Sequence, residues 1–170
     1  MAAKNGCTVA LIEKEKEIAE TVRTSGVTCI SDINEFGIPK DCYNPIKKFS
    51  FCSPKNYVTI ADDVAKAAVL DVRKTYRFLA TRAKSSGSEL FTDTNVSEVL
   101  KDSSGKCVGV VAKSQGKLIQ FNAKVVIDAS GFTSIVAKEL GYVTQWKKFG
   151  AGAEFEVKTE KLEYDNWWLM

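Results

Sequence analysis

The sequence of 170 residues contains no histidine. This absence excludes the Ser-His-Asp and Cys-His constellations of nucleophilic catalysis, so any chemistry must come from other side chains or from a cofactor. Five cysteines are present, but none of them forms a C-x-x-C pair, and we expect no metal site. Unpaired thiols of this kind suit a reducing, cytoplasmic compartment.

Long apolar runs and a one-sided charge are also absent. No segment approaches the roughly 18 to 20 apolar residues that span a bilayer. The first apolar run, residues 7–12, ends at Glu13 without a cleavage-site pattern, so no signal peptide is expected. The 24 basic and 21 acidic residues are scattered along the chain, which argues against a nucleic-acid partner.

What the sequence does contain is an alternation of apolar runs typical of an α/β protein. Residues 8–13 form a short apolar run closed by an acid, which predicts a strand buried on both faces of a parallel sheet. An amphipathic helix is predicted over about residues 72–85 and a strand over 89–92. Residues 95–100, 107–113 and 117–122 predict a β-meander. A second fully buried strand at 123–127 and a helix at about 134–140 follow.

Two further regions lie outside this pattern. Residues 31–62 hold all three prolines and predict an insertion with an edge strand at 49–53, paired with 58–61. We expect its aromatic side chains to be buried, namely Phe36, Tyr43, Phe49, Phe51 and Tyr57. From residue 150 onward the pattern predicts a new system of strands.

Two strand ends carry candidate binding residues. Glu13 follows an apolar strand, as does the acid that accepts hydrogen bonds from the adenosine ribose in dinucleotide-binding units, about 20 residues after a glycine-rich turn. Counting back from Glu13 places that turn before Met1, so the sequence is expected to lack it; a solvated strand end is the alternative. Asp128 and Gly131 end the second strand, where a carboxylate can accept from a polyol such as the ribitol of a flavin. The alternative there is an ordinary strand-to-helix turn.

Together, these two strand ends, separated by a helix and a meander, resemble the glutathione-reductase-like FAD-binding fold of aromatic hydroxylases, halogenases and geranylgeranyl reductases. The resemblance covers residues 1–141. Three segments are similar to the geranylgeranyl reductase family, especially the archaeal enzymes that saturate isoprenoid lipids: residues 22–26, 53–56 and 70–76. This chain departs from the family's pattern at two places. Many family members have a cysteine near the position of Thr24 and an acid at the position of Arg77.

The resemblance implies an incomplete FAD/NAD(P)-binding Rossmann-like domain with an inserted β-meander over residues 1–145, without the first strand and its G-x-G-x-x-G turn. It also implies that residues 146–170 begin an antiparallel substrate-domain sheet, with 31–62 as a substrate-side insertion. No catalytic side chain is assigned. The implied cofactor-binding residues are Glu13 on the adenosine ribose, Arg23 and Arg73 beside the flavin or its phosphates, Val96 at the adenine, Asp128 on the ribitol, and Gly131.

For function, the resemblance implies an FAD-dependent reductase that saturates geranylgeranyl or prenyl groups in archaeal membrane-lipid synthesis. Its partners would be a prenylated lipid, an external electron donor such as NAD(P)H or ferredoxin, and the inner face of the cell membrane as a peripheral contact. Trp167 and Trp168 are candidates for an apolar substrate wall, of which only one can face it, because neighbouring strand residues point to opposite faces.

There are two alternatives to a prenyl reductase: a flavin-dependent monooxygenase or halogenase of the same fold, and a non-catalytic truncated remnant. Without the glycine-rich turn, we expect these 170 residues alone to bind FAD weakly and to be inactive.

Overall fold

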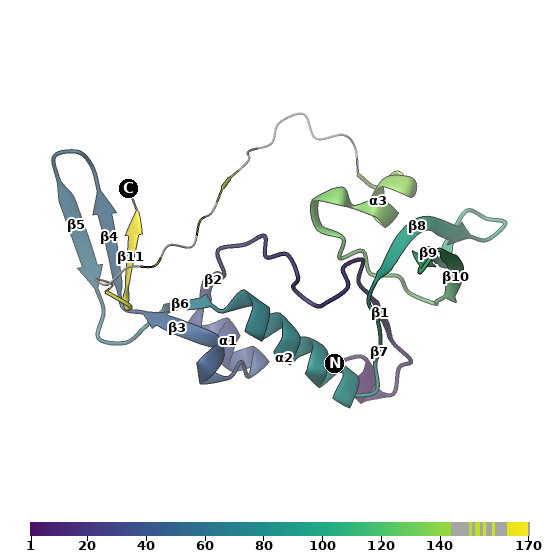
Figure 1. Cartoon of the computed structure of the whole chain (residues 1–170), viewed down its shortest axis with the longest axis horizontal. Helices are drawn as coiled ribbons and strands as arrows, with labels where there is room; N and C mark the ends of the chain where they lie inside the picture. The colour runs from purple at the N-terminus through teal and green to yellow at the C-terminus, as the bar shows by residue number, and fades with distance from the viewer. Residues whose placement is uncertain (144–149, 151, 154, 156–157, 159–162, 170) are drawn as a thin grey trace. The chain divides into compact units, whose positions relative to one another are not determined.

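The computed structural model describes residues 1–143, 150, 152–153, 155, 158 and 163–169. It divides into two compact units, each assembled from segments far apart in the sequence. Unit 1 comprises Met1–Glu20 and Ala83–Gly152, and unit 2 comprises Thr21–Arg82 and Ala153–Met170. Figure 1 labels the helices and strands of both units.

Unit 1 contains a parallel strand pair and an antiparallel meander. Strand β1 (Ala10–Ile12) pairs with β7 (Glu89–Phe91) in parallel, with Ala10 opposite Glu89. Three antiparallel strands follow in the order β10-β9-β8: β8 (Thr94–Lys101), β9 (Cys107–Ser114) and β10 (Lys117–Asn122). The predicted meander is therefore confirmed. A bulge between Val96 and Glu98 interrupts the β8–β9 register.

The core of unit 1 joins the meander to the C-terminal helix. Helix α3 (Ile135–Glu139) follows a short 3₁₀ helix, η3 (Gly131–Thr133). Val99, Val110 and Val136 are buried together. Packed against these three are Ile12, Val96, Cys107, Phe121, Val126 and Leu140. The segments that carry Glu13, Val96 and Asp128 thus share one hydrophobic core.

The two strands expected to be buried on both faces are not. Residues 123–127 pair with no strand among the described residues, and Val125 and Ile127 are 75% and 85% exposed. β1 is a strand, as predicted, but Ala10 and Leu11 are exposed. The physical reason is the same in both places: an apolar run is buried only where neighbours cover it, and in the described part of the chain β1 has β7 alone.

Unit 2 contains a small sheet and the longest helix. The sheet has the order β2-β6-β3 and is antiparallel, with β2 (Val27–Cys29), β6 (Ala67–Leu70) and β3 (Tyr43–Ile46). Unit 2 also contains the helices α1 (Ile30–Phe36), η2 (Lys40–Cys42) and α2 (Val72–Ser85). The last three residues of α2 are grouped with unit 1. Helix α2 has the predicted bounds, and Asp71 caps it by accepting a hydrogen bond of 3.0 Å from Lys74 N. At the start of the chain, η1 (Ala3–Asn5) ends at Gly6, which has a left-handed backbone conformation.

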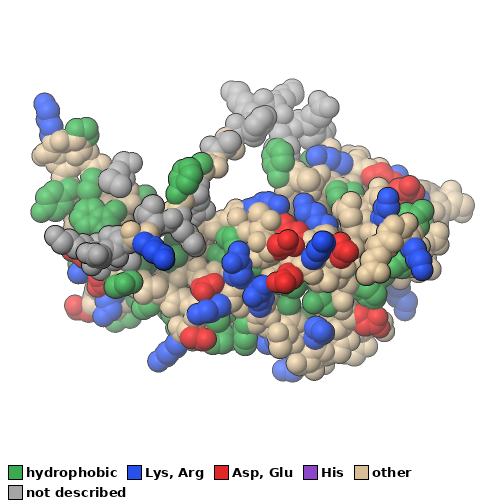
Figure 2. Space-filling view, in the orientation of Figure 1, with side chains coloured by type: hydrophobic (Ala, Val, Ile, Leu, Met, Phe, Trp, Pro, Cys, Tyr) green, Lys and Arg blue, Asp and Glu red, His purple; other side chains and the backbone are tan. Residues whose placement is uncertain are grey.

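The second sheet of unit 2 has the order β11-β4-β5, with β4 (Lys48–Cys52), β5 (Tyr57–Ala61) and β11 (Asn166–Leu169). The predicted β4–β5 hairpin is confirmed. Because β11 runs parallel to β4, the sheet is mixed rather than antiparallel as expected. Figure 2 shows hydrophobic side chains gathered over this hairpin.

Burial of the aromatic residues in this region differs from the prediction. Phe36, Phe51 and Tyr57 are 48%, 44% and 75% exposed, whereas Tyr43 and Phe49 are half-buried. On β5 every residue is exposed, since no described element covers the hairpin. Within the described residues, no helix is long and apolar enough to cross a membrane.

Candidate functional site

Asp128 is the most constrained polar side chain of the predicted site. Its Oδ1 accepts hydrogen bonds from Ser130 N at 3.0 Å and from Ser130 Oγ at 2.6 Å. Its Oδ2 accepts a hydrogen bond of 2.8 Å from Ala137 N, in the first turn of α3. Asp128 therefore fixes the turn that contains Gly131 and caps the helix that follows.

These contacts set the charge state of Asp128. Partial burial would raise the pKa of this carboxyl, but the hydrogen bonds from Ser130, Ala137 and Val136 outweigh it and hold the pKa below its usual range. The group is thus an anion at neutral pH. Asp128 is therefore a positioned, charged acceptor, held by Ser130 and by the first turn of α3.

Glu13 lies where β1, β7 and β8 meet. Its backbone N–H donates to Phe91 O at 2.8 Å, and its carbonyl accepts from Thr94 N at 3.0 Å. The half-buried carboxylate accepts one hydrogen bond of 2.9 Å, from Glu15 N to Oε1. No described residue bonds Oε2, so this oxygen can also accept a hydroxyl. Val96 is two residues beyond Thr94 on β8. Both predicted adenosine-side residues therefore lie near the start of this strand, Val96 on it and Glu13 hydrogen-bonded to it.

The residues of unit 1 fit the sugar parts of a dinucleotide. Hydroxyl donors need fixed acceptors, and Glu13 and Asp128 each present a half-buried, positioned carboxylate. Gly131 has a φ of 66°, and a Cβ there would meet nothing within 4 Å, so its backbone is open to a ligand. The sequence contains no G-x-G-x-x-G turn for the pyrophosphate.

The two predicted arginines lie in unit 2, and both are exposed. Leu70 N donates to Gly26 O at 2.9 Å, and a Cβ on Gly26 would lie 2.8 Å from Leu70 O. The φ of 74° at Gly26 is in the left-handed region, so glycine is favoured there. Arg23 and Arg73 are each three residues from this contact, which brings their two segments together at the start of α2.

The two tryptophans lie on opposite faces of β11, as predicted. Trp167 is opposite Phe49, with their rings edge to face at 5.9 Å, and Phe49 is opposite Ile60. The register gives this face six apolar residues: Phe49, Phe51, Val58, Ile60, Trp167 and Leu169. We call it the apolar sheet face. Trp168 lies on the other face with Ser50 and Thr59, whose hydroxyls are 2.8 Å apart.

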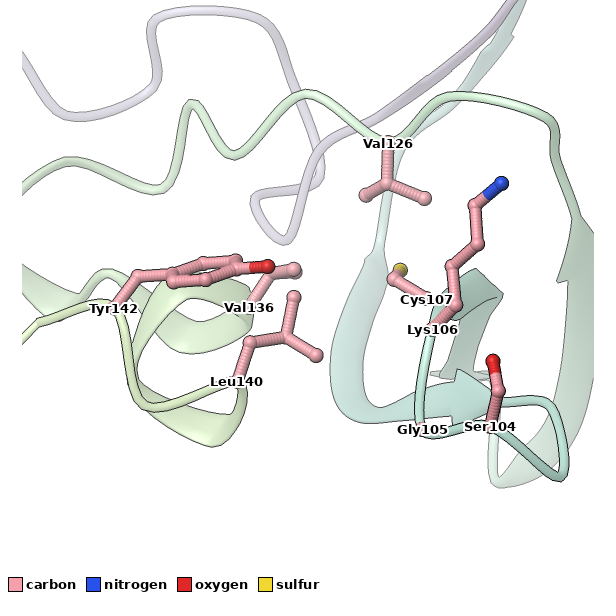
Figure 3. A pocket seen from close by; sticks show the side chains of 8 residues that line it. All are labelled: Ser104, Gly105, Lys106, Cys107, Val126, Val136, Leu140 and Tyr142. Carbon is pink, nitrogen blue, oxygen red and sulfur yellow. The ribbon is translucent and has the colours of Figure 1, made fainter.

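Two features were not predicted from the sequence. One is a hollow of about 440 Å³ in unit 1, which Figure 3 shows between the end of α3 and the β8–β9 turn. It is lined by Ser104, Gly105, Lys106, Cys107, Val126, Val136, Leu140 and Tyr142, none of them a predicted site residue. The other is Glu139, whose Oε2 accepts a hydrogen bond of 2.9 Å from Val99 N. An acid at the end of a helix interacts unfavourably with the helix dipole, and this unusual position was the sequence feature that could have singled out Glu139.

A parallel strand pair with an acid at its end, a meander, and a second acid before a helix are the features expected of a dinucleotide-binding protein of the flavin-dependent class. The chain matches the FAD dependent oxidoreductase family over residues 1–152 and belongs to it. The predictions of the fold class and of FAD as the cofactor are therefore confirmed at the level of the family.

Individual relatives agree with the predicted resemblance. The digeranylgeranylglycerophospholipid reductase of Methanocaldococcus jannaschii is 32% identical over 167 residues, which cover 95% of this chain and 42% of that protein. The chain thus spans less than half the length of this relative.

Two solved structures share the fold. A geranylgeranyl bacteriochlorophyll reductase-like protein from Thermoplasma acidophilum has a TM-score of 0.66 at 23% identity, over 73% of this chain and 33% of that one. The flavin-dependent brominase Bmp2 also has a TM-score of 0.66 at 23% identity, over 83% of this chain and 36% of that one. At these identities the two structures support the fold alone.

Proposed function

We propose that the protein to which these residues belong is an FAD-dependent reductase that saturates the double bonds of geranylgeranyl or related prenyl groups of membrane lipids. The observation that carries the proposal is the 32% identity to an archaeal digeranylgeranylglycerophospholipid reductase over 95% of the chain. When bound, a reduced flavin supplies the hydride for such a saturation, which explains how a chain without histidine can serve an enzyme.

In this proposal, the residues of the chain bind and orient the cofactor. Glu13 accepts from the adenosine ribose through Oε2, and the Asp128 carboxylate accepts from the ribitol. The backbone of Val96 borders the adenine, and Gly131 lets the chain approach the cofactor closely. Arg23 and Arg73 neutralise phosphate charge. In this proposal, residues 1–145 form the FAD-binding domain, except that the insertion at 31–62 lies on the substrate side. Residues 146–170 begin the substrate-binding domain.

The apolar sheet face is the proposed wall for the prenyl chain. Three of its six residues, Phe51, Val58 and Ile60, are 44%, 57% and 56% exposed, and neighbouring exposed apolar residues of this kind commonly mark a binding surface. A flexible hydrocarbon chain needs apolar contact without polar partners, and this face offers no hydrogen-bonding side chain except the indole N–H of Trp167. Since Trp167 lies on this face and Trp168 on the other, the proposal places Trp167, and not Trp168, at the substrate.

The direct test uses the intact protein with reduced flavin and a geranylgeranylated lipid, followed by mass spectrometry. We expect a gain of two hydrogen atoms for each saturated double bond. No gain, with flavin bound and reduced, overturns the proposal. Incorporation of bromine or oxygen into an aromatic substrate would instead favour the halogenase or monooxygenase alternative, which shares the fold.

Two matched variants test the substrate wall. Trp167→Ala should raise KM for the lipid about tenfold, because a large buried apolar side chain contributes roughly 1.5 to 3 kcal/mol. Trp168→Ala removes the same side chain from the opposite face of β11 and should leave KM nearly unchanged. Equal effects of the two substitutions contradict the assignment.

The identity of the electron donor, NAD(P)H or ferredoxin, is tested by supplying each in turn. The proposed peripheral membrane contact is tested by sedimentation with lipid vesicles.

A further inference from the structure

Glu139, the last residue of α3, ties this helix to the edge of the meander. Its Oε2 accepts a hydrogen bond of 2.9 Å from the backbone N–H of Val99 on β8. Lys101 strengthens the contact, since its Nζ donates to Glu139 O at 3.1 Å and lies 4.0 Å from Oε1. The helix is thus attached to β8 through both its side chain and its main chain.

The backbone of β8 explains why an acceptor is needed at this place. In the order β10-β9-β8, strand β8 is at the edge, and its outer N–H groups have no partner strand in the described part of the chain. Val99 is only 8% exposed, so water has little access to that donor. An unpaired donor in such a position is costly, and the Glu139 carboxylate satisfies it.

The opposite end of α3 is held by Asp128, one of the predicted cofactor-binding residues. Asp128 Oδ2 accepts from Ala137 N at 2.8 Å, so a helix of five residues is anchored by Asp128 at its start and by Glu139 at its end. β8, to which Glu139 is bonded, also carries Val96, three residues before Val99. The bulge between Val96 and Glu98 lies between these two positions.

We propose that Glu139 is a positioning residue for the cofactor: by holding α3 against β8, it fixes Asp128 relative to Val96, the two places that receive the ribitol and the adenine. The proposal rests on the FAD site put forward above. It adds that the spacing between the two ends of that site depends on a side chain that does not touch the cofactor.

A first test needs no flavin. In the 170-residue chain, the Asp128 carboxyl is titrated by NMR in the wild type, Glu139→Gln and Glu139→Ala, with Glu98→Ala as the control. Glu98 is an exposed glutamate on the same strand, next to Val99. Removing the charge of Glu139 would by itself lower the pKa of Asp128, whereas displacing α3 removes the hydrogen bond from Ala137 and raises it. We expect a rise in Glu139→Ala, a smaller rise in Glu139→Gln, which keeps an acceptor, and no change in Glu98→Ala.

A second test measures the affinity of the intact protein for FAD. Losing a hydrogen bond worth about 1 kcal/mol lowers the population of the binding-competent arrangement by up to about fivefold, and Kd rises by the same factor. Glu139→Ala should show this rise, Glu139→Gln part of it, and Glu98→Ala none. Where Glu139→Ala does not fold, the comparison of Glu139→Gln with Glu98→Gln decides.

The outcomes separate the two proposals. A wild-type protein that binds no FAD overturns the cofactor site, while the titration of Asp128 still decides whether Glu139 positions it. An Asp128 pKa that falls or stays constant in Glu139→Ala overturns the positioning role. Equal FAD affinity in Glu139→Ala and Glu98→Ala overturns it as well.

Discussion

Replacing Asp128 by asparagine removes one acceptor from a carboxylate that uses both of its oxygens. The amide oxygen can still accept from Ser130. The amide nitrogen then faces the N–H of Ala137, which loses its acceptor and meets another donor. We expect the first turn of α3 to open more often, although the rest of the helix keeps its sequence.

The size of the effect follows from that one hydrogen bond. A hydrogen bond to a charged group contributes about 1.5 to 3 kcal/mol, and Asp128 is half-buried, so solvent reduces its share. We therefore expect a loss of about 1 to 2 kcal/mol, which corresponds to a roughly 5- to 30-fold faster exchange of the Ala137 amide hydrogen. Hydrogen exchange of the 170-residue chain, followed by NMR, measures this rate directly.

Asp102 provides a matched control, since it makes a similar turn with one oxygen only. Its Oδ1 accepts from Ser104 N, Ser104 Oγ and Lys106 N at 2.9, 2.6 and 3.0 Å. Asparagine can supply that oxygen, so Asp102→Asn should leave the exchange of the Lys106 amide close to the wild-type rate. Equal acceleration at Ala137 in Asp128→Asn and at Lys106 in Asp102→Asn would refute the reasoning.

The same contacts predict a pH dependence. The pKa of Asp128 is lower in the folded chain than its unfolded value of about 3.9, because the charged form is hydrogen-bonded. Its contribution to stability is therefore complete above about pH 4 to 5 and is lost as the pH falls through the folded pKa. Asp128→Asn should remove that part of the acid sensitivity, which acid titration followed by circular dichroism measures.

Two further predictions concern stability and thiol reactivity. Gly109→Ala places a Cβ against the carbonyl oxygen of Phe121 and should cost more than about 2 kcal/mol in urea unfolding, whereas Gly116→Ala, with nothing within 4 Å, should cost about 1 kcal/mol. Burial, followed by the charge of the adjacent Asp41, raises the pKa of the Cys42 thiol. Cys42 should thus react with iodoacetamide more slowly than the exposed Cys7, as mass spectrometry of the labelled peptides will show; equal rates contradict the burial.

Local periodicity was sufficient to predict the elements whose partners are close in the sequence. Helix α2, the meander and the β4–β5 hairpin were found because their patterns and turns are contained within short segments. The run at residues 123–127 has an equally clear pattern but no partner in the described part of the chain, and Val125 and Ile127 are exposed. Burial is a property of neighbours, which the local pattern does not contain.

The candidate site was predicted in part for a similar reason. Glu13 and Asp128 were identified because acids at strand ends are local features. Their hydrogen-bond partners Glu15, Ser130 and Ala137 lie within nine residues, but the turns that bring them close are visible only in the structure. Glu139 was missed because its partner, Val99, is 40 residues away along the chain.

The parallel pairing of β11 with β4 also constrains the order of folding. β4 and β5 are joined by a short turn and can pair as soon as both are made. In contrast, the contact between Asn166 and Ser50 joins residues that are 116 positions apart in the sequence. Because closing so long a loop is slow, the sheet should be completed last, after unit 1 has formed. Until then, the side of β4 that β11 will occupy is an open strand edge, at which the nascent chain can pair with another copy.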